Sequence, residues 1–368
     1  MQVSPFKLER YFARYEFNAR YLLCSSDCES ICIGDLLALE PGSEEVMRRH
    51  WLGYTESPGS PSLRKEIARI YSSIAPDEVL VFSGAEEAIF LFMLAQLKAG
   101  DHLIVHWPCY QSLFEIAKGI GADVSLWEAR GERDWSLDLD ELRQLVRPDT
   151  RAVIVNTPHN PTGYLMSRSD FDELNRFTQE RGLLLFCDEV YRELEYDPAD
   201  RLPAACDVNP YAVSLGVMSK SYGLAGLRIG WIATHQMELL QRISALKDYT
   251  TICNSAPSEL LSEIALRHRD QLTARNLQLI KNNLLLLDAF FERHANRFQW
   301  IRPTAGPIAF PRLLDGDIDS FCDELVQESG VLLLPGTLYD HPGNHFRVGF
   351  ARRNMPEALA QLEKFIIG

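Results

Sequence analysis

The sequence lacks any apolar run near the roughly 20 residues that a membrane-spanning helix needs. Its amino-terminal segment, MQVSPFKLERYFARYEFNARYLL, spreads charges through the apolar positions. That segment therefore also lacks the uninterrupted apolar centre of a secretory signal. We expect a cytoplasmic protein with no membrane partner.

Basic residues are in deficit. Lys and Arg together number 37 against 51 Asp and Glu, which gives a formal charge of -14 at pH 7. A nucleic-acid-binding surface needs clustered Lys and Arg. The composition therefore argues against a nucleic-acid partner and favours a small-molecule one.

Cysteine is scarce, with eight residues scattered through the chain, as is typical of reduced thiols in a cytosolic enzyme. The spacing of Cys24, Cys28 and Cys32 is the exception, because it could place three sulfurs on one face of a helix. The segment CSSDCESIC supplies no fourth ligand and lacks the pairwise spacing of zinc sites. We expect no metal here and interpret these cysteines as small, semi-buried side chains.

The chain contains no internal repeat and no low-complexity linker, and its 368 residues favour two domains. From about Pro61, helical patterns alternate with short β-branched strands such as EVLVFSG, HLIVHWP, RAVIVNTP and LLLFCDEVY. Such alternation predicts an α/β fold in which helices cover both faces of a mostly parallel sheet, in three αβα layers. Long helical patterns follow Trp231. We expect a large domain over residues 46–250 and a smaller α+β domain built from residues 1–45 and 251–368.

Polar clusters follow four of the predicted strands, as FSGAEE, NTPHNPTG, CDEVY and MSKSYG. Ligands of parallel α/β sheets bind beyond the carboxyl ends of the strands. The four clusters are therefore expected to form one site, and Lys220 lies in the last of them. Burial favours the neutral amine of a lysine, which can then attack a carbonyl carbon.

A Schiff base to pyridoxal phosphate is the leading use of such a lysine, and this chain can meet the other needs of that cofactor. Backbone N–H groups at the start of a helix, at Gly84, Ala85 and Glu86, could cradle the phosphate. Arg228 could add positive charge and Ser219 a hydroxyl.

The pyridine ring of the cofactor requires a partner for its nitrogen, donors to its phenolate oxygen and an aromatic group to stack on it. Asp188 could keep the pyridine nitrogen protonated, Asn160 and Tyr191 could donate to the phenolate oxygen, and Tyr110 could stack on the ring. Taken alone, Asp188 or Asn160 would be read as a capping or turn residue. His159 is interpreted as a turn residue, since the lysine already serves as the base.

Six motifs in order now resemble those of fold type I pyridoxal phosphate enzymes, in the class I and II aminotransferase family: YTESPGSPSLRKEI, SGAEEA, NTPHNPTG, CDEVY, SKSYGLAGLRIGW and FRVGFA. The resemblance implies that Lys220 holds the cofactor and carries the proton, and that Arg347 binds the substrate carboxylate. It also implies that Tyr54 reaches the phosphate of a neighbouring subunit. A homodimer with shared active sites would follow.

Two positions depart from the pattern of this family. Val217 stands where a phosphate-binding serine is frequent, and Glu86 stands where a small hydroxyl residue is frequent. Because a carboxylate close to a phosphate is repelled, we expect the Glu86 side chain to turn away and only its N–H to serve.

The amino-terminal segment, which closes over the substrate side chain in this family, contains Ser26, Asp27 and Glu29. A carboxylate in a closed pocket would select a cationic partner, and Glu9 is a weaker candidate for the same task. The alternative is that Asp27 and Glu29 cap the following helix or face solvent.

Three functions are compatible with these residues. The first is transfer of an amino group from an L-α-amino acid, including one with a cationic side chain, to a keto acid acceptor. The second resembles the capreomycidine and enduracididine synthases, which eliminate a hydroxyl from a hydroxyarginine and close the guanidine into a ring. The third is a cofactor-binding regulator without turnover, which the absence of a basic helix-turn-helix pattern disfavours. No residue separates the first two.

Overall fold

The computed structural model describes residues 1–368, and its centre is a seven-stranded sheet. The strands are β2 (Val79–Phe82), β3 (His102–Trp107), β4 (Asp123–Glu128), β5 (Thr150–Asn156), β6 (Leu184–Asp188), β7 (Ala212–Val217) and β8 (Gly230–Ala233). Their spatial order is β2-β8-β7-β6-β5-β3-β4, and only β8 runs against its neighbours. The expected mostly parallel α/β fold is confirmed.

Helices cover both faces of this sheet. Successive side chains of a strand point to opposite faces, and the apolar side chains on each face are buried under helices. Ala152 and Ile154 of β5 join a core with α5 (Ala85–Gln96), α6 (Ser112–Ile120) and α10 (Met237–Lys247). Val153 and Val155 join a second core with α7 (Leu139–Leu145) and α8 (Arg168–Glu180). Burial on both faces explains why the inner strands read as continuous apolar runs.

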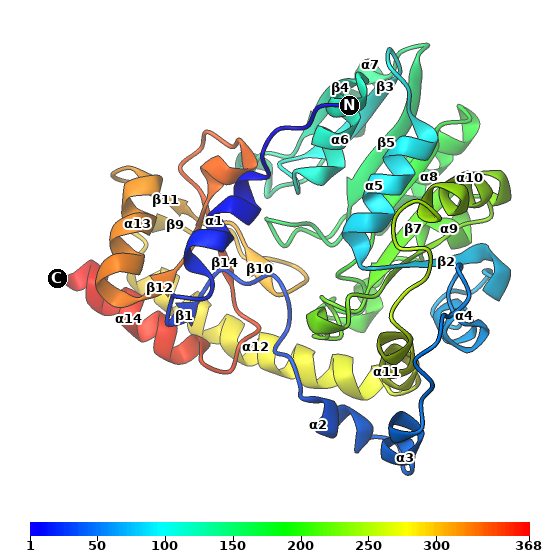
Figure 1. The fold of residues 1–368 in the computed structure, drawn as a ribbon. Coiled ribbons are helices and arrows are strands. Elements are labelled where there is room, and N and C mark those ends of the chain that lie inside the picture. The colour runs from blue at the N-terminus through cyan, green and yellow to red at the C-terminus, as the bar shows by residue number, and fades with distance from the viewer.

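A third core closes the β2 end of the sheet. It packs α4 (Pro61–Ala68) and α11 (Ala256–Arg267) against β2 and β8. The short helices α2 (Ile33–Leu37) and α3 (Ser43–Arg48) lie at the lower edge of the molecule in Figure 1. Helix α9 (Ala205–Val208) lies against β7, where the Cys206 amide donates to Ser214 Oγ at 3.1 Å. The domain boundary expected at residue 250 stays a prediction, and α11, which lies beyond it, packs with the large sheet.

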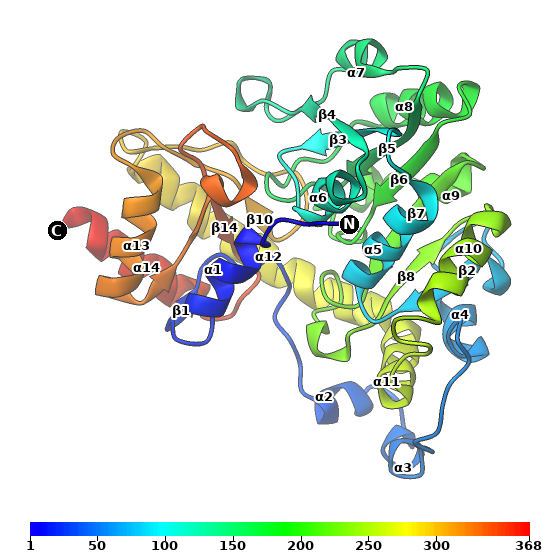
Figure 2. The same ribbon diagram turned by 45° about the horizontal axis from the view of Figure 1, so that its top comes forward.

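The long helical pattern after Trp231 forms two helices, α11 and the 25-residue α12 (Arg269–Arg293). His268 separates them with φ -111° and ψ 21°, which is not helical backbone. In Figures 1 and 2, α12 (yellow) runs from α11 to the carboxy-terminal part of the molecule.

The carboxy-terminal part contains α13 (Ile318–Ser329), α14 (Met355–Ile367) and short strands. The strands are β9 (Phe298–Gln299), β10 (Ile308–Ala309), β11 (Arg312–Leu313), β12 (Val331–Leu332), β13 (Leu334–Pro335) and β14 (Phe346–Gly349). The amino terminus joins them, because β1 (Tyr21–Leu22) pairs in parallel with β12. Both views show α1 (Lys7–Tyr15, blue) beside this part. No helix combines the length and the apolar character that a membrane crossing needs.

Gly230 at the start of β8 lies directly against the turn that begins α5. A Cβ atom at this position would meet the backbone of Gly84 and the Ala85 nitrogen, each at 2.7 Å. Real Cβ contacts are longer than this, so any side chain here would push β8 away from the start of α5. This close approach fixes the turn between β2 and α5.

Gly230→Ala is therefore expected to destabilise the fold by about 1–3 kcal/mol, as overpacking of a dense core typically does. Thermal unfolding measures this as a melting temperature several degrees lower. Gly226→Ala is the matched control, since a Cβ atom at Gly226 meets nothing within 4 Å. Equal melting temperatures for the two variants would contradict the close approach.

Candidate active site

A cavity of about 390 Å³ opens at the carboxyl ends of the parallel strands. Strands β2, β5, β6 and β7 all point toward it, because β8 is antiparallel to both β2 and β7. The lining residues come from the last position of each strand or from the segment that follows it: Ala85 and Glu86 after β2, Asn156 and Asn160 at β5, Asp188 and Tyr191 at β6, and Ser219 and Lys220 after β7. The four predicted strand ends therefore meet, and the cavity has the size of small-molecule sites.

Lys220 lies among polar groups of this cavity. Its Nζ donates a hydrogen bond to Ser26 Oγ at 2.8 Å. Burial lowers the pKa of the amine, whereas the nearby Asp27 and Asp188 carboxylates oppose that shift. The amine is thus closer to its neutral, nucleophilic form than an exposed lysine is.

Asp188 ends β6 and is 6% exposed. Burial raises the pKa of its carboxyl to about 7, although the Val190 amide and Lys220 oppose the shift. Asn156, which was not anticipated from the sequence, links the end of β6 to the segment after β5 through two hydrogen bonds. Its Nδ2 donates to the Asp188 carbonyl at 2.9 Å, and its Oδ1 accepts from the Asn160 amide at 2.6 Å.

A cradle with anion-binding character lies where β2 turns into α5. Gly84 has φ 92°, and a Cβ atom there would meet Arg228 Nη2 at 2.4 Å, so only glycine lets the arginine approach. Arg228 Nη1 lies 3.5 Å from Ser219 Oγ. The Gly84 N–H donates to the Phe82 carbonyl at 2.8 Å, so the N–H groups left for an anion are those of Ala85 and Glu86. Together with a guanidinium and a hydroxyl, they suit a phosphate.

The Glu86 side chain, which we expect to turn away from a bound phosphate, contacts the start of α6. It lines the cavity and accepts a hydrogen bond from Ser112 Oγ at 3.2 Å. Burial raises its pKa to about 7, while the Ser112 hydrogen bond opposes and the Glu9 carboxylate adds to the shift. A protonated Glu86 avoids the repulsion that motivated the expectation.

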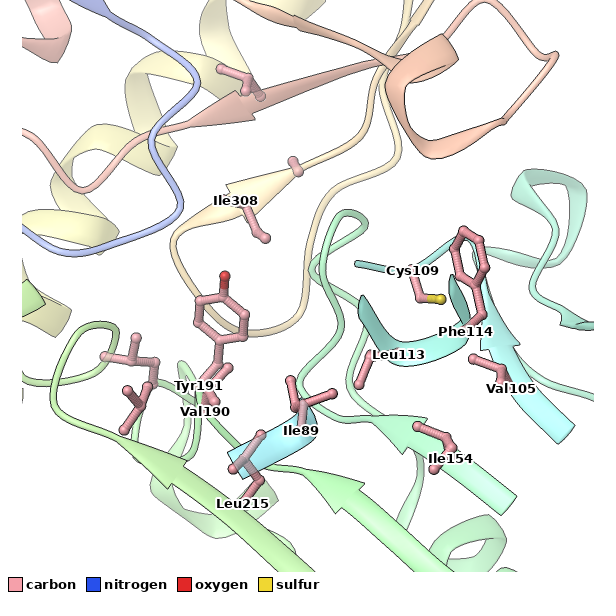
Figure 3. Packing of buried hydrophobic residues seen from close by; sticks show 14 of the residues in the cluster. Ile89, Val105, Cys109, Leu113, Phe114, Ile154, Val190, Tyr191, Leu215 and Ile308 are labelled. Carbon is pink, nitrogen blue, oxygen red and sulfur yellow. The ribbon is translucent and has the colours of Figure 1, made fainter. Parts of the chain in front are cut away.

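Two tyrosines, Tyr110 and Tyr191, line the cavity. The Tyr191 hydroxyl is buried without a hydrogen-bond partner in the chain, and it points away from Val190 and Leu215 (Figure 3). Tyr110 packs its ring on Phe6 with centroids 4.9 Å apart and donates its hydroxyl proton to Glu9 Oε1 at 3.1 Å. The unpaired hydroxyl of Tyr191 is available to a bound molecule.

Arg347 on β14 brings the carboxy-terminal part of the chain into the cavity. It is 1% exposed, and its Nε donates to the Cys24 carbonyl at 3.0 Å. Its Nη1 donates to Asn160 Oδ1 at 3.2 Å and to Tyr339 Oη at 2.6 Å. Tyr339 was not anticipated from the sequence. Tyr339 belongs to no motif and lies in a segment without the periodicity of a strand or helix, ten residues before the last residue of FRVG.

The amino-terminal segment supplies three carboxylates to the lining, namely Glu9, Glu16 and Asp27. Arg352 Nη2 donates to both Asp27 oxygens, at 2.8 and 2.9 Å. Glu16, which the sequence analysis passed over, forms no ion pair, and burial followed by repulsion from Glu9 raises its pKa. Glu29 does not line the cavity, because its carboxylate accepts the Arg353 amide at 3.1 Å.

Five other residues considered from the sequence lie outside the lining. Tyr54 is 86% exposed on the surface of the chain. His159 is held by Thr162 Oγ1 at 2.7 Å and by the Pro108 carbonyl at 2.8 Å, as expected of a turn residue. Cys24, Cys28 and Cys32 do not share a helical face: the first two are buried in irregular backbone, and Cys32 caps α2.

Comparison with known proteins now identifies the family. The model of the family described as aminotransferase class I and II matches residues 35–363. The chain belongs to this family. The six motifs and their order are thereby explained, and the chain is an enzyme rather than a regulator.

The relatives of this aminotransferase-family chain include two kinds of enzyme. Capreomycidine synthase of Streptomyces vinaceus is 28% identical over 362 residues, 97% of this chain and 92% of the relative. Aspartate aminotransferase of Thermotoga maritima is 28% identical over 341 residues, 89% of this chain and 88% of the relative.

Solved structures show the same division. A PLP-dependent aminotransferase from Streptococcus suis superposes with a TM-score of 0.94 at 31% identity, over 100% of this chain and 98% of that one. The PLP-dependent cyclase OrfR superposes with a TM-score of 0.92 at 31% identity, with the same coverage. The fold is therefore that of fold type I PLP enzymes, and the family implies pyridoxal phosphate as cofactor.

The residues of the cavity fit this cofactor. The cradle formed by Gly84, Ser219 and Arg228 suits its phosphate, and the buried Asp188 carboxyl suits a protonated pyridine nitrogen. The unpaired Tyr191 hydroxyl is a donor without an acceptor inside the chain, as a phenolate-binding group would be. When bound, pyridoxal phosphate supplies an electron sink for the substrate α-carbon.

Stability of the cofactor-free protein is expected to fall as pH rises. Asp188 and Glu86 keep their protons in the folded state up to about pH 7, whereas their ordinary values are 3.8 and 4.5. The folded state then binds more protons than the unfolded state between about pH 4 and 7, so stability decreases through that window. For Asp188 the loss is on the order of 4 kcal/mol, at about 1.4 kcal/mol for each unit of its raised pKa.

Thermal unfolding of cofactor-free protein from pH 5 to 8 measures this slope. Asp188→Asn should flatten it, since the amide has no charge to desolvate. The exposed Asp149→Asn serves as control and should keep the wild-type slope. An unchanged slope in Asp188→Asn would show that the carboxylate is already ionised and stabilised in the folded chain.

Proposed function

We propose that this protein is a pyridoxal phosphate-dependent aminotransferase that acts on an L-α-amino acid with a cationic side chain. One observation supports this most strongly. A buried lysine amine and a buried guanidinium share one cavity whose amino-terminal wall carries the carboxylates of Glu9, Glu16 and Asp27. Such a cavity offers a different partner to each end of the substrate.

The α-carboxylate end fits Arg347. The Nε and Nη1 atoms of its guanidinium are engaged by Cys24, Asn160 and Tyr339, so its Nη2 is left to bind an incoming carboxylate. The guanidinium is already held in place by these acceptors. Little side-chain entropy is then lost when the substrate binds.

Lys220 is the proposed base. It lines the same cavity as Asp27 and Asp188, and burial lowers its pKa, which favours the neutral Nζ that can take the proton from the substrate α-carbon. Asp188 would hold the proton of the cofactor pyridine nitrogen, and Asn160 and Tyr191 would donate to the cofactor phenolate oxygen. Ser26, bonded to Lys220 Nζ, would keep the amine directed toward the substrate.

The side-chain end of the substrate fits the acidic wall. Asp27 is neutralised by Arg352, but Glu16 forms no ion pair and is repelled by Glu9 and Asp27. A partly buried carboxylate beside like charges is stabilised by a cation. An ammonium or guanidinium group on the substrate supplies that cation.

Homodimerisation completes the proposal. Trp51, Leu52, Tyr54 and Tyr249 are between 77% and 90% exposed. Their segments lie side by side, because Ser57 Oγ donates to Asp248 Oδ1 at 3.2 Å. Exposed apolar patches of this kind mark interfaces. Tyr54 of one subunit would reach the phosphate cradle of the other.

Light scattering at micromolar concentration should give a mass near twice the 41.9 kDa of one chain. The double variant Trp51→Ser, Leu52→Ser should shift the mass toward that of the monomer, because it removes the apolar patch. A monomeric wild-type protein would contradict the shared site.

A second reaction is favoured by a specific observation. Capreomycidine synthase is similar over 97% of this chain, and the acidic wall would hold a guanidinium as well as an ammonium. The alternative is therefore elimination of the hydroxyl of a hydroxyarginine as water, with closure of the guanidine nitrogen onto the carbon chain. Lys220 and the cofactor would serve both reactions.

Product analysis separates the two reactions. The purified holoenzyme is incubated with arginine, lysine, hydroxyarginine and neutral amino acids, with and without a keto acid. Amino transfer gives a new keto acid and a new amino acid; cyclisation gives a product lighter by one water that retains its nitrogen. Lys220→Ala should abolish both products and the visible colour of the holoenzyme. Turnover by that variant would overturn the proposal.

Glu16→Gln should change substrate preference. We expect kcat/KM for a cationic amino acid to fall about tenfold or more, equivalent to about 1.4 kcal/mol of lost charge pairing. The value for a neutral amino acid should change less than twofold. Glu44→Gln, on the exposed surface of α3, is the control and should leave both values unchanged. An equal fall in kcat/KM for both substrates would contradict recognition of the substrate charge by Glu16.

A further inference from the structure

Tyr339 is buried at the end of the short helical turn Gly336–Tyr339 and is 2% exposed. Its ring packs edge-on against Phe310, with centroids 5.9 Å apart. Its hydroxyl lies 2.6 Å from Arg347 Nη1 and 3.0 Å from Asn160 Oδ1. The residue does not line the cavity, yet it contacts two residues that do.

The direction of these hydrogen bonds follows from the chemistry of the groups. A guanidinium has only N–H donors, so the tyrosine oxygen must accept from Arg347. Its single proton is then free for the carboxamide oxygen of Asn160. The chain of donation therefore runs from Arg347 through Tyr339 to Asn160.

This chain decides which way the Asn160 amide faces. Two donors, Tyr339 Oη and Arg347 Nη1, converge on Oδ1. With the nitrogen in that place, two donors would oppose an N–H group. The Asn160 backbone is also fixed, through its N–H bond to Asn156 Oδ1 at 2.6 Å. Nδ2 must then face away from Arg347, on the side of the cavity.

We propose that Tyr339 is a positioning residue: it turns the Asn160 amide so that Nδ2 donates toward the cofactor oxygen, and it holds Arg347 so that Nη2 meets the substrate carboxylate. One hydroxyl thus aligns the cofactor contact and the substrate contact together. The inference rests on the proposed function, because it takes Arg347 as the carboxylate site and Asn160 as the cofactor donor.

Tyr339→Phe tests it, since the ring is kept and only the hydroxyl is removed. The first readout is the pH titration of the visible absorption band of the holoenzyme. An N–H donor favours the charged form of the oxygen it contacts. With the donor misdirected, we expect the titration midpoint to rise by about 0.5 pH units or more. This readout needs bound cofactor but no substrate, so it stands apart from any failure of the proposed reaction.

The second readout is kinetic. Tyr339→Phe should raise KM for the amino acid about tenfold, with a smaller change in kcat, because the Arg347 guanidinium is less well held. Tyr71→Phe is the matched control: the buried Tyr71 oxygen accepts from Trp231 Nε1 at 2.8 Å, outside the cavity. It should lose a similar amount of stability and change neither the midpoint nor KM.

A double variant makes the test specific. Asn160→Asp removes the amide N–H, so it should shift the midpoint at least as far as Tyr339→Phe. If Tyr339 acts through that N–H, Tyr339→Phe added to Asn160→Asp shifts the midpoint no further. Additive shifts would overturn the inference, as would a Tyr339→Phe holoenzyme with the wild-type midpoint and KM. If Tyr339→Phe does not fold, Tyr339→His, which keeps a ring N–H donor, should fold and give a midpoint between those of the wild type and Asn160→Asp; a midpoint as high as that of Asn160→Asp would overturn the inference.

Discussion

The common direction of four strands is the constraint on which the active site depends. Parallel strands end at the same edge of a sheet, so the loops that follow them must meet there. In this protein β2, β5, β6 and β7 share that direction, although antiparallel β8 lies between β2 and β7. The insertion of β8 also brings Gly230 against the start of α5, which fixes the proposed phosphate cradle.

Charge of both signs is concentrated in the resulting cavity. Lys220, Arg228 and Arg347 face carboxylates that are shielded from water, and each group shifts the pKa of its neighbours. In water these interactions would be weak, because the dielectric constant screens them. Loss of hydration on burial raises the pKa of Asp188 to about 7 in the cofactor-free chain and lowers the pKa of Lys220, whereas the attraction between these two groups opposes both shifts. In the proposed function, the partly buried Glu16 carboxylate, which forms no ion pair within the chain, selects a substrate with a cationic side chain.

Prediction from the sequence succeeded where the signal was local. The strands, the helices α5 to α8 and the polar residues at strand ends follow from periodicity within short windows, and the six motifs identify the family. Prediction did not anticipate that Glu86 accepts a hydrogen bond from Ser112, the first residue of α6. It also missed the pairing of Asp27 with Arg352, which lies more than three hundred positions away.

The sequence by itself determined the order of the strands along the chain, the family and the identity of the residues at the strand ends, because these depend on nearest neighbours. Tertiary structure alone decided which side chains share a hydrogen bond across the cavity. Tyr339 carries no motif of its own, and it reaches Asn160 only because β14 brings the carboxy-terminal part of the chain over the sheet. Such contacts join segments that are distant along the chain, and their geometry is set by packing rather than by local preference.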